Sequence, residues 1–202
     1  MKSGDFPQTS ENRPIAQIVG QRSIVVDIRI TKTRKSIADA FLALRARKPI
    51  EKITVKELCE KAQINKSTFY THYRDIYDLS EELEARLADE ITASLTCPED
   101  LLAHPDRFVQ EFARAYRARQ PRIGVLFSGS RAPMLLPRIE SSLQQMFFEQ
   151  RPDCRDDVAA RAVFTLMIYG SFHAFEKHRA QGEDAVLAAL AQADRELVRL
   201  LG

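Results

Sequence analysis

The sequence predicts an all-α protein, with a short basic helical unit near the N-terminus and a longer helical region behind it. Apolar residues recur at three- and four-residue spacing along most of the 202 residues, which is the pattern of amphipathic helices. Residues 31–78 carry eleven Lys and Arg against six Asp and Glu, whereas residues 79–202 carry fifteen against nineteen. A basic block of this kind either binds a polyanion or is an ordinary solvated surface, and charge alone leaves both interpretations open.

The composition narrows the class of protein. Apolar residues make up 45% of the chain and charged residues 29%, which fits a soluble protein with a real core. No stretch approaches the roughly 18 uninterrupted apolar residues of a membrane span, and residues 1–20 lack a secretory signal. Cys59, Cys97 and Cys154 are odd in number and widely spaced, with no CxxC pair. We therefore expect a reduced, cytoplasmic chain with no metal, no cofactor and no membrane partner.

The first 30 residues are expected to form an arm that is partly disordered. Residues 1–14 are polar and contain two prolines. Residues 24–30 (IVVDIRI) are compatible with a short strand, an extended arm or the lead-in to the first helix.

The first helix is predicted to begin near Thr31, with Thr31 or Thr33 as its cap. Pro49 is expected to end it near Arg47. Its buried face is marked by apolar residues at i, i+4 and i+7: Ile37, Phe41 and Leu44.

Two short helices and a three-residue turn follow. Thr54 is the natural N-cap of the second helix, and Glu57 three residues later completes a capping box. Residues 63–65 interrupt the apolar pattern, and a third short helix is predicted over about residues 66–73. Asp75 can cap a fourth helix that runs from Ile76 to about Leu95. The buried face of the second helix is expected to hold Val55, Leu58, Cys59 and Ala62.

The remaining residues, 79–202, also have helical periodicity. Pro98 and Pro105 bracket a break, and the Pro and Gly residues of 121–134 predict a looser region there. Helices are predicted around residues 108–116 and over about residues 135–148, 156–179 and 183–201.

A capped helix, a tight turn and a second short helix form the helix-turn-helix arrangement of DNA-binding proteins. In that arrangement the first helix braces against the DNA backbone and the second presents its N-terminal half to base edges in the major groove. Phe69 and Tyr73 share one face and can anchor the third helix to the core. The residues left to project outward are polar and able to bond phosphate or bases: Lys66, Ser67, Thr68, Tyr70, Thr71 and His72.

The stretch Ile53–Leu79, ITVKELCEKAQINKSTFYTHYRDIYDL, resembles the DNA-binding domain of the TetR/AcrR family of bacterial regulators. The resemblance covers about a quarter of the chain, from Thr31 through Leu79. It implies a domain arrangement of an N-terminal arm (1–30), a three-helix helix-turn-helix domain (31–78) and a helical regulatory and dimerisation domain (79–202). It also implies an Ω-shaped homodimer that places two recognition helices on a roughly palindromic operator.

The resemblance assigns DNA-binding roles to individual residues. Tyr70 and His72 match the family's phosphate-contacting pair, and Thr54 matches a phosphate contact at the start of the second helix. Lys32 and Arg34 are expected to approach the DNA backbone or the minor groove. The full set implied to bind DNA is Lys32, Arg34, Thr54, Lys66, Ser67, Thr68, Tyr70, Thr71 and His72.

Two positions depart from the family pattern. Gln63 stands in the turn where the family often has glycine, and Ile76 stands where it commonly has a lysine that contacts phosphate.

Family members often hold a small effector between the C-terminal helices, and the resemblance implies such a cavity here. The long apolar helix around Phe164 and the last helix are implied to form the dimer interface, as a four-helix bundle across a twofold axis. Most aromatic and methionine side chains of this region are expected to be core. The candidates for ligand contact are Phe112, Tyr116, Phe127, Met146, Met167 and Tyr169.

Three functions compete at this point. The first is a repressor released from its operator by a small ligand, and the second is a DNA-binding regulator controlled by a protein partner instead. The third is a helical enzyme, but the sequence offers no nucleophile–base pair, paired carboxylates, phosphate loop or metal cluster. His173 and His178 lie five residues apart, a poor spacing for joint metal binding from one helix face. We therefore expect a regulator and not an enzyme.

Overall fold

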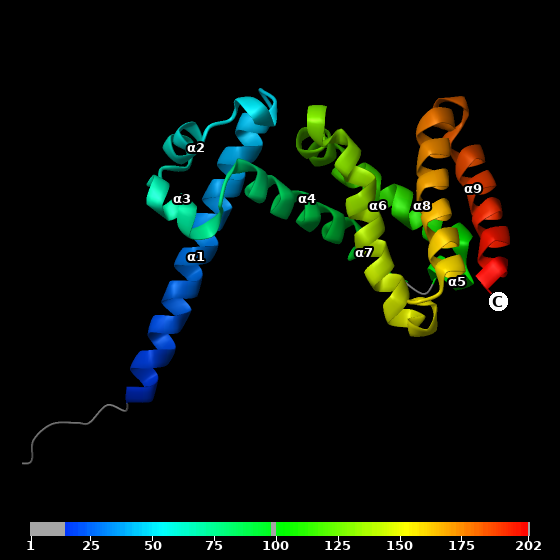
Figure 1. Ribbon diagram of the computed structural model, residues 1–202, viewed down its shortest axis with the longest axis horizontal. Helices are drawn as coiled ribbons and strands as arrows, with labels where there is room; N and C mark the ends of the chain where they lie inside the picture. Colours follow the sequence, from blue (N-terminus) through cyan, green and yellow to red (C-terminus); the bar gives the residue numbers. More distant parts are fainter. Residues whose placement is uncertain (1–14, 98–99, 202) are drawn as a thin grey trace, which may run out of the picture.

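The computed structural model describes residues 15–97 and 100–201. All regular secondary structure in these ranges is helical, which confirms the predicted all-α class. The molecule is elongated, with α1 (Ile15–Arg45) at one end and the pair α8 (Val158–His178) and α9 (Glu183–Val198) at the other (Figure 1).

α1 begins much earlier than the sequence predicts. The predicted start near Thr31 is wrong because the helix already begins at Ile15, and Thr33 lies within it, donating from Oγ1 to the Arg29 carbonyl at 2.9 Å. Residues 24–30 are therefore helical, which agrees with the lead-in to the first helix among the three alternatives, and the part of the predicted arm from Ile15 onward belongs to α1. No proline follows Pro14 in the chain before residue 49, so nothing interrupts the helical hydrogen bonds. Residues 1–14 lie outside the described residues.

The next three helices lie where the sequence predicts them. A 3₁₀ turn, η1 (Ile50–Lys52), separates α1 from α2 (Val55–Ala62), and α3 (Lys66–His72) follows after three residues. α4 (Ile76–Thr92) ends three residues before the predicted Leu95.

The segment after α4 also departs from expectation. α5 (Asp100–Ala103) is a single turn, and α6 (Pro105–Leu126) continues straight through the region predicted to be loose from residue 121. Pro121 lacks a backbone donor, but the apolar stripe of the helix goes on beyond it, and Ile123 is buried. The burial of that stripe outweighs one lost hydrogen bond, so the helix persists.

The remaining elements lie close to their predicted positions. A 3₁₀ segment, η2 (Gly129–Met134), leads into α7 (Leu135–Gln150), and η3 (Pro152–Cys154) separates α7 from α8. Asp157 caps α8 by accepting the Ala159 N–H at 2.8 Å. Two further 3₁₀ turns, η4 (Arg179–Gln181) and η5 (Arg199–Leu201), flank α9.

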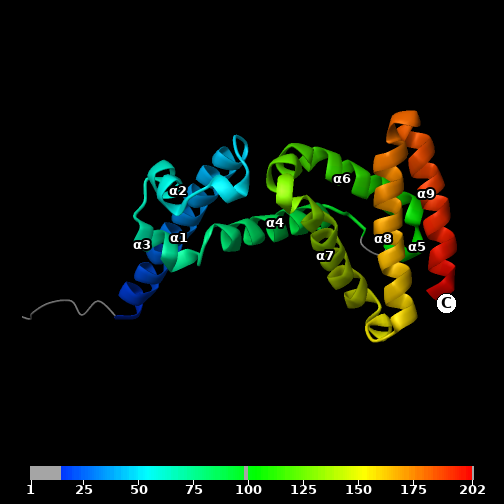
Figure 2. The same ribbon diagram turned by 45° about the horizontal axis from the view of Figure 1, so that its top comes forward.

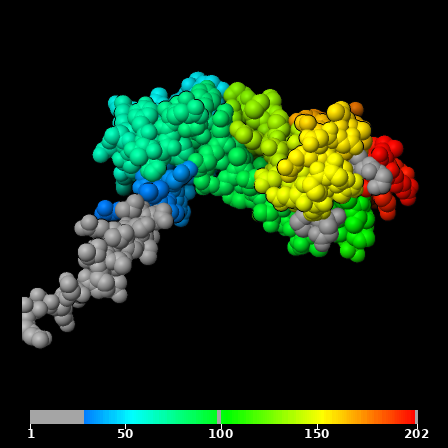
Figure 3. Space-filling view, turned by 60° about the horizontal axis from the view of Figure 1, so that its bottom comes forward, coloured from blue at the N-terminus to red at the C-terminus, as the bar shows by residue number. Residues whose placement is uncertain are grey.

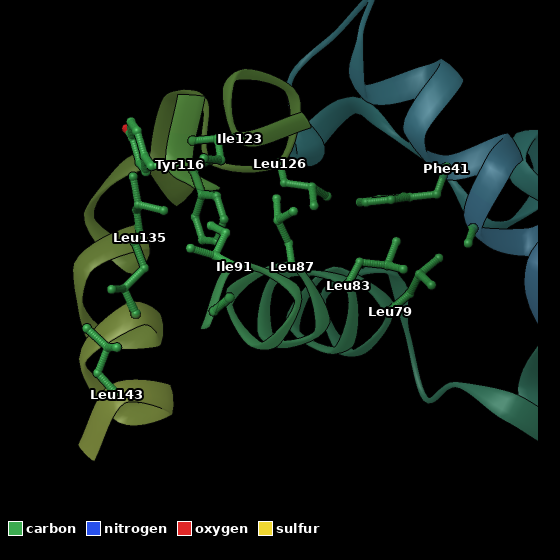
Figure 4. Packing of buried hydrophobic residues seen from close by; sticks show 14 of the residues in the cluster. Phe41, Leu79, Leu83, Leu87, Ile91, Tyr116, Ile123, Leu126, Leu135 and Leu143 are labelled. Atoms are coloured by element: carbon green, nitrogen blue, oxygen red, sulfur yellow. The ribbon is translucent and has the colours of Figure 1, made fainter. Parts of the chain in front are cut away.

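The larger of two hydrophobic clusters runs along the molecule, and α4 is its central element. α4 crosses from the N-terminal helices to the C-terminal ones (Figure 2). Its buried side chains face α1 at one end and α6 and α7 at the other (Figure 4). The predicted boundary between residues 78 and 79 falls in the first turn of α4, and this core crosses it. The labelled core residues are Phe41, Leu79, Leu83, Leu87, Ile91, Tyr116, Ile123, Leu126, Leu135 and Leu143.

α8 is apolar on more than its buried face. Within the described residues, the segment Val158–Gln181 is the one helical stretch long and apolar enough to cross a membrane, with a mean hydropathy of 1.3 over its most apolar window, and only 22% of that window is buried. Val158 is 79% exposed and Leu166 56% exposed. Along the same side lie the exposed Ala159, Ala162 and Gly170. α8 therefore presents an apolar stripe that its own subunit does not cover.

Candidate nucleic-acid interface and apolar cavity

α2 begins at a side-chain cap. Thr54 has extended backbone, and its Oγ1 accepts the Glu57 N–H at 3.2 Å. This is one of the two hydrogen bonds of the predicted capping box. The second would join the Glu57 carboxylate to the Thr54 N–H, but that carboxylate forms an ion pair with Lys48 on the loop after α1. The cap and the ion pair fix the direction in which α2 leaves that loop.

The turn between α2 and α3 is tight and depends on one left-handed residue. Gln63 has φ 56° and ψ 47°, and the Ile64 N–H donates to the Cys59 carbonyl at 3.0 Å. This is the geometry that glycine adopts most easily at a helix C-terminus. The turn therefore forms with Gln63 in place of glycine, and Gln63 takes a left-handed backbone conformation that glycine adopts more easily.

α3 divides into a buried face and a polar face. Phe69 is fully buried and Tyr73, directly after the helix, is nearly so, which confirms both as anchors. Their rings lie 5.7 Å apart, centroid to centroid. The ring of Tyr70 meets Phe69 edge-on and is 57% exposed, so it lies off the buried face as predicted.

The other residues assigned to DNA by the sequence lie on or beside this polar face. Thr71 is exposed, and its hydroxyl donates to the Ser67 carbonyl at 2.9 Å. Thr68 and His72 are half-buried at the edges of the helix. The exposed members of the set on α3 are Lys66, Ser67, Tyr70 and Thr71.

The two basic residues predicted to approach the DNA backbone or the minor groove, Lys32 and Arg34, lie within α1 and differ in their surroundings. Lys32 is exposed. Arg34 is half-buried, forms an ion pair with Glu82 of α4, and holds its guanidinium carbon 5.5 Å from the centre of the Tyr73 ring. Arg34 thus links α1 to α4 and to the residue that follows α3.

The first turn of α4 explains the second departure from the family pattern. Ile76 is buried, so an apolar contact with the core replaces the lysine. Asp75 caps the helix by accepting the Asp78 N–H at 2.8 Å. Arg74, exposed beside it, pairs with Asp78 at 2.8 Å. Arg74 is thus an exposed cation two residues before Ile76 in the sequence.

The C-terminal helices enclose a cavity of about 70 Å³ between α6, α7, α8 and α9. Of the six ligand-contact candidates, Phe112, Tyr116 and Met167 line it. The others lie elsewhere: Phe127 is buried in the core, Met146 packs against the core, and Tyr169 lies half-buried on α8. The predicted set therefore identified the aromatic wall on α6 and missed most of the rest.

Two polar residues at the cavity were not predicted as site residues. Asp194 of α9 is 5% exposed, and its two carboxylate oxygens accept from the Ser171 hydroxyl of α8 at 3.0 and 3.1 Å. Burial raises the pKa of the Asp194 carboxyl to about 6, against the opposing effect of the Ser171 hydrogen bond. The available signal was an acid on an apolar stripe, since Asp194 falls between Leu190 and Leu197 at heptad spacing.

A scan against models of protein families finds no match. The chain is a distant relative of a helix-turn-helix regulator. It is 26% identical over 136 residues to the uncharacterized HTH-type transcriptional regulator YxbF of Bacillus subtilis (strain 168), a match that covers 63% of this chain and 35% of that protein. The matched part is thus about a third of the length of the relative.

A polar joint connects the C-terminal end of α6, the helix whose first half lines the cavity, to the end of α1. Arg45 at the end of α1 is buried, and its Nη2 donates to the Leu126 carbonyl at 3.2 Å and to Ser128 Oγ at 2.8 Å. Two residues on, Ser130 forms a hydrogen bond with Glu51 of η1. The space-filling view shows the yellow-green segment after α6 lying directly against the N-terminal helices (Figure 3). A movement at the end of α6 would therefore be transmitted to α1 through these contacts.

Proposed function

We propose that this protein is a DNA-binding regulator of transcription that reads its operator with α3. The observation that carries the proposal is the α2–turn–α3 unit, in which a capped helix and a left-handed turn present a polar, exposed face on a short second helix. The net positive charge of residues 31–78 and the distant relationship to a protein named as an HTH-type transcriptional regulator support it.

In finer detail, we propose a TetR/AcrR-type repressor that acts in the cytoplasm as a homodimer. The resemblance of Ile53–Leu79 to that family and the uncovered apolar stripe of α8 both favour this assignment. A second copy of the chain would cover the stripe, and α8 and α9 of two subunits would form a four-helix bundle. The twofold axis would then place the two α3 helices in successive major grooves, about 34 Å apart.

Control by a small molecule is the form of regulation that the cavity supports over a protein partner. A ligand between α6 and α8 would favour one conformation of α6, and the Arg45 joint would pass the change to α1. Release from DNA then requires only that the ligand bind the DNA-incompetent conformer more tightly than the competent one.

The decisive experiment is a gel-shift assay with the intergenic DNA beside the protein's own gene. We expect sequence-selective binding that weakens as salt rises, because counterions are released from the phosphates. Thr68→Ala and Tyr70→Ala should each weaken binding at least tenfold, whereas Gln120→Ala, an exposed change on α6, should not. The absence of selective binding by the folded wild-type protein would refute the proposal. A promoter–reporter assay then separates repression from activation.

A further inference from the structure

The cavity between α6, α7, α8 and α9 is apolar over most of its lining, and Ser171 and Asp194 are polar residues in it. Most of its lining consists of Phe, Leu, Ile, Met and Val side chains, and Asp194 is the one charged side chain among the described residues that line it. The aromatic wall is continuous: the rings of Phe112 and Tyr116 are stacked at 6.4 Å, and Tyr116 meets Phe172 edge-on at 5.7 Å. A ligand here would bury an apolar body and reach a carboxylate. Because the cavity holds only about 70 Å³, a ligand of about ten heavy atoms enters only if the lining side chains move apart.

Asp194 has fewer partners than a buried carboxylate normally needs. Its two oxygens offer about four acceptor sites, and the single Ser171 hydroxyl supplies one proton. No Lys, Arg or His of the part of the chain that the structure describes forms an ion pair with it. Buried carboxylates are ordinarily paired with a cation or hydrogen-bonded several times, so this group has unused capacity to accept.

The burial of Asp194 has a desolvation cost that an apolar side chain at the same position would not have. Asp194 stands on the buried stripe of α9, between Leu187 and Leu197, where an apolar side chain would pack without a desolvation cost. A charge retained on such a stripe at the wall of a cavity is typical of a binding site and not of a core.

We propose that the cavity binds an amphipathic organic amine, with its ammonium group on Asp194 and its apolar body against Phe112, Tyr116 and Phe172. This inference rests on the proposed function, since it names the effector class of the same regulator. The ammonium group supplies the hydrogen-bond donors and the positive charge that the carboxylate lacks. The aromatic faces add cation–π and apolar contact. A carboxylate ligand of the same shape is excluded by charge repulsion in a low-dielectric site.

The test uses three probes with one apolar body and different heads: 4-phenylbutylamine, 4-phenylbutan-1-ol and 4-phenylbutanoate. Their binding to the full chain is measured by titration calorimetry at pH 7.5, where Asp194 is mostly ionised. We expect the amine to bind roughly tenfold or more tightly than the alcohol, and the acid to bind weakest. Equal binding of amine and alcohol, preference for the acid, or no binding of any probe to the folded protein would overturn the proposal.

Three variants locate the effect. Asp194→Asn should remove the preference for the amine over the alcohol, and Asp184→Asn, an exposed change on the same helix, should keep it. Ser171→Ala should keep or increase the preference, because it takes away the one donor that competes with the ligand. A preference that survives in a folded Asp194→Asn protein refutes the assignment, and if that variant does not fold, a preference lost in Ser171→Ala refutes it.

Failure of this inference is separable from failure of the proposed function. Probe binding is measured without DNA, and operator binding is measured without probe. A protein that binds its operator selectively and ignores the amine is a regulator with another effector, whereas a protein that binds the amine and no operator has a cation site without the proposed function.

Discussion

Gln63 is the residue on which the geometry of the helix-turn-helix unit depends most. Its left-handed backbone costs an L-residue roughly 1–2 kcal/mol, while glycine adopts it freely but loses more entropy on folding. We expect Gln63→Gly to raise the free energy of unfolding by about 0.5–1 kcal/mol, measured by urea denaturation. Gln63→Val should lower it, because a β-branched residue is least tolerated at positive φ. A Gly variant less stable than wild type would show that the Gln63 side chain contributes more than its backbone costs.

Asp194 predicts a pH dependence of stability with a definite sign. Its pKa is about 6 in the folded protein and about 3.9 in an unfolded chain, so the folded state binds more protons between these values. The contribution of Asp194 to the free energy of unfolding is therefore complete below about pH 4 and falls as the pH rises toward 6. Above that pH it stays low, and the total loss is at most about 3 kcal/mol.

Asp194→Asn removes this loss. Urea unfolding at pH 7.5 should show the variant to be more stable than wild type by about 1–3 kcal/mol, and at pH 4.5 the difference should shrink to about a third of that value. Other groups titrate in both proteins and cancel in the comparison. Equal effects at the two pH values would mean that Asp194 is not held in a pKa-raising environment.

For single residues, local patterns such as caps and helix faces could be predicted from the sequence, whereas contacts with other helices could not. The Thr54 cap follows from a spacing of three to Glu57, and the opposite exposure of Phe69 and Tyr70 follows from the 100° helical step. Asp194 is different, because an acid on an apolar stripe near a helix end can point to solvent or to a cavity. Only the neighbouring Ser171 on another helix decides between them.

Among the elements, η2 is held to α4 by a buried ion pair. Glu84 is fully buried and accepts from Arg131 Nε at 2.7 Å, from Arg131 Nη2 at 2.5 Å and from Ser80 at 2.8 Å. We expect Arg131→Met to destabilise the protein by about 3–5 kcal/mol in urea unfolding, because it leaves a buried charge without its main partner.

A double variant and a surface pair control for this interpretation. Glu84→Leu combined with Arg131→Met should recover most of the lost stability, since it removes both charges. Arg122→Met breaks the more exposed pair with Glu90 and should cost less than about 1 kcal/mol. Similar losses for Arg131→Met and Arg122→Met would contradict a special role for the buried pair.

Elements were predictable where the apolar period and the helix-ending residues agreed. They agree for α2, α3 and α7, and these helices lie where expected. They conflict in α6, where Pro121 signals a break and the buried Ile123 continues the stripe, and packing decided the outcome. The pairing of Glu84 with Arg131 joins residues 47 positions apart, which no local pattern reveals.

At the scale of the whole molecule, the predicted boundary between residues 78 and 79 separates a basic part of the chain from an acidic part, but it does not separate two hydrophobic cores. α4 carries buried residues that face α1 at one end and α7 at the other, so both parts share one core. The packed side chains of α4 therefore connect the region of the cavity to the N-terminal helices. The Arg45 hydrogen bonds to the end of α6 add a polar link to this apolar one.

The uncovered stripe of α8 leads to a prediction about assembly. Leu166→Glu places a carboxylate in the middle of the proposed dimer interface, so we expect light scattering to show a dimer for the wild type and a monomer for the variant. Operator affinity should fall by a hundredfold or more, because two linked recognition helices act with a high effective concentration that a monomer lacks. Gln120→Glu adds the same charge to an exposed position of α6 and should change neither quantity.

A Leu166→Glu protein that stays dimeric and binds DNA normally would place the interface elsewhere. A wild-type protein that is monomeric and partitions into lipid vesicles would instead make α8 a membrane-binding helix.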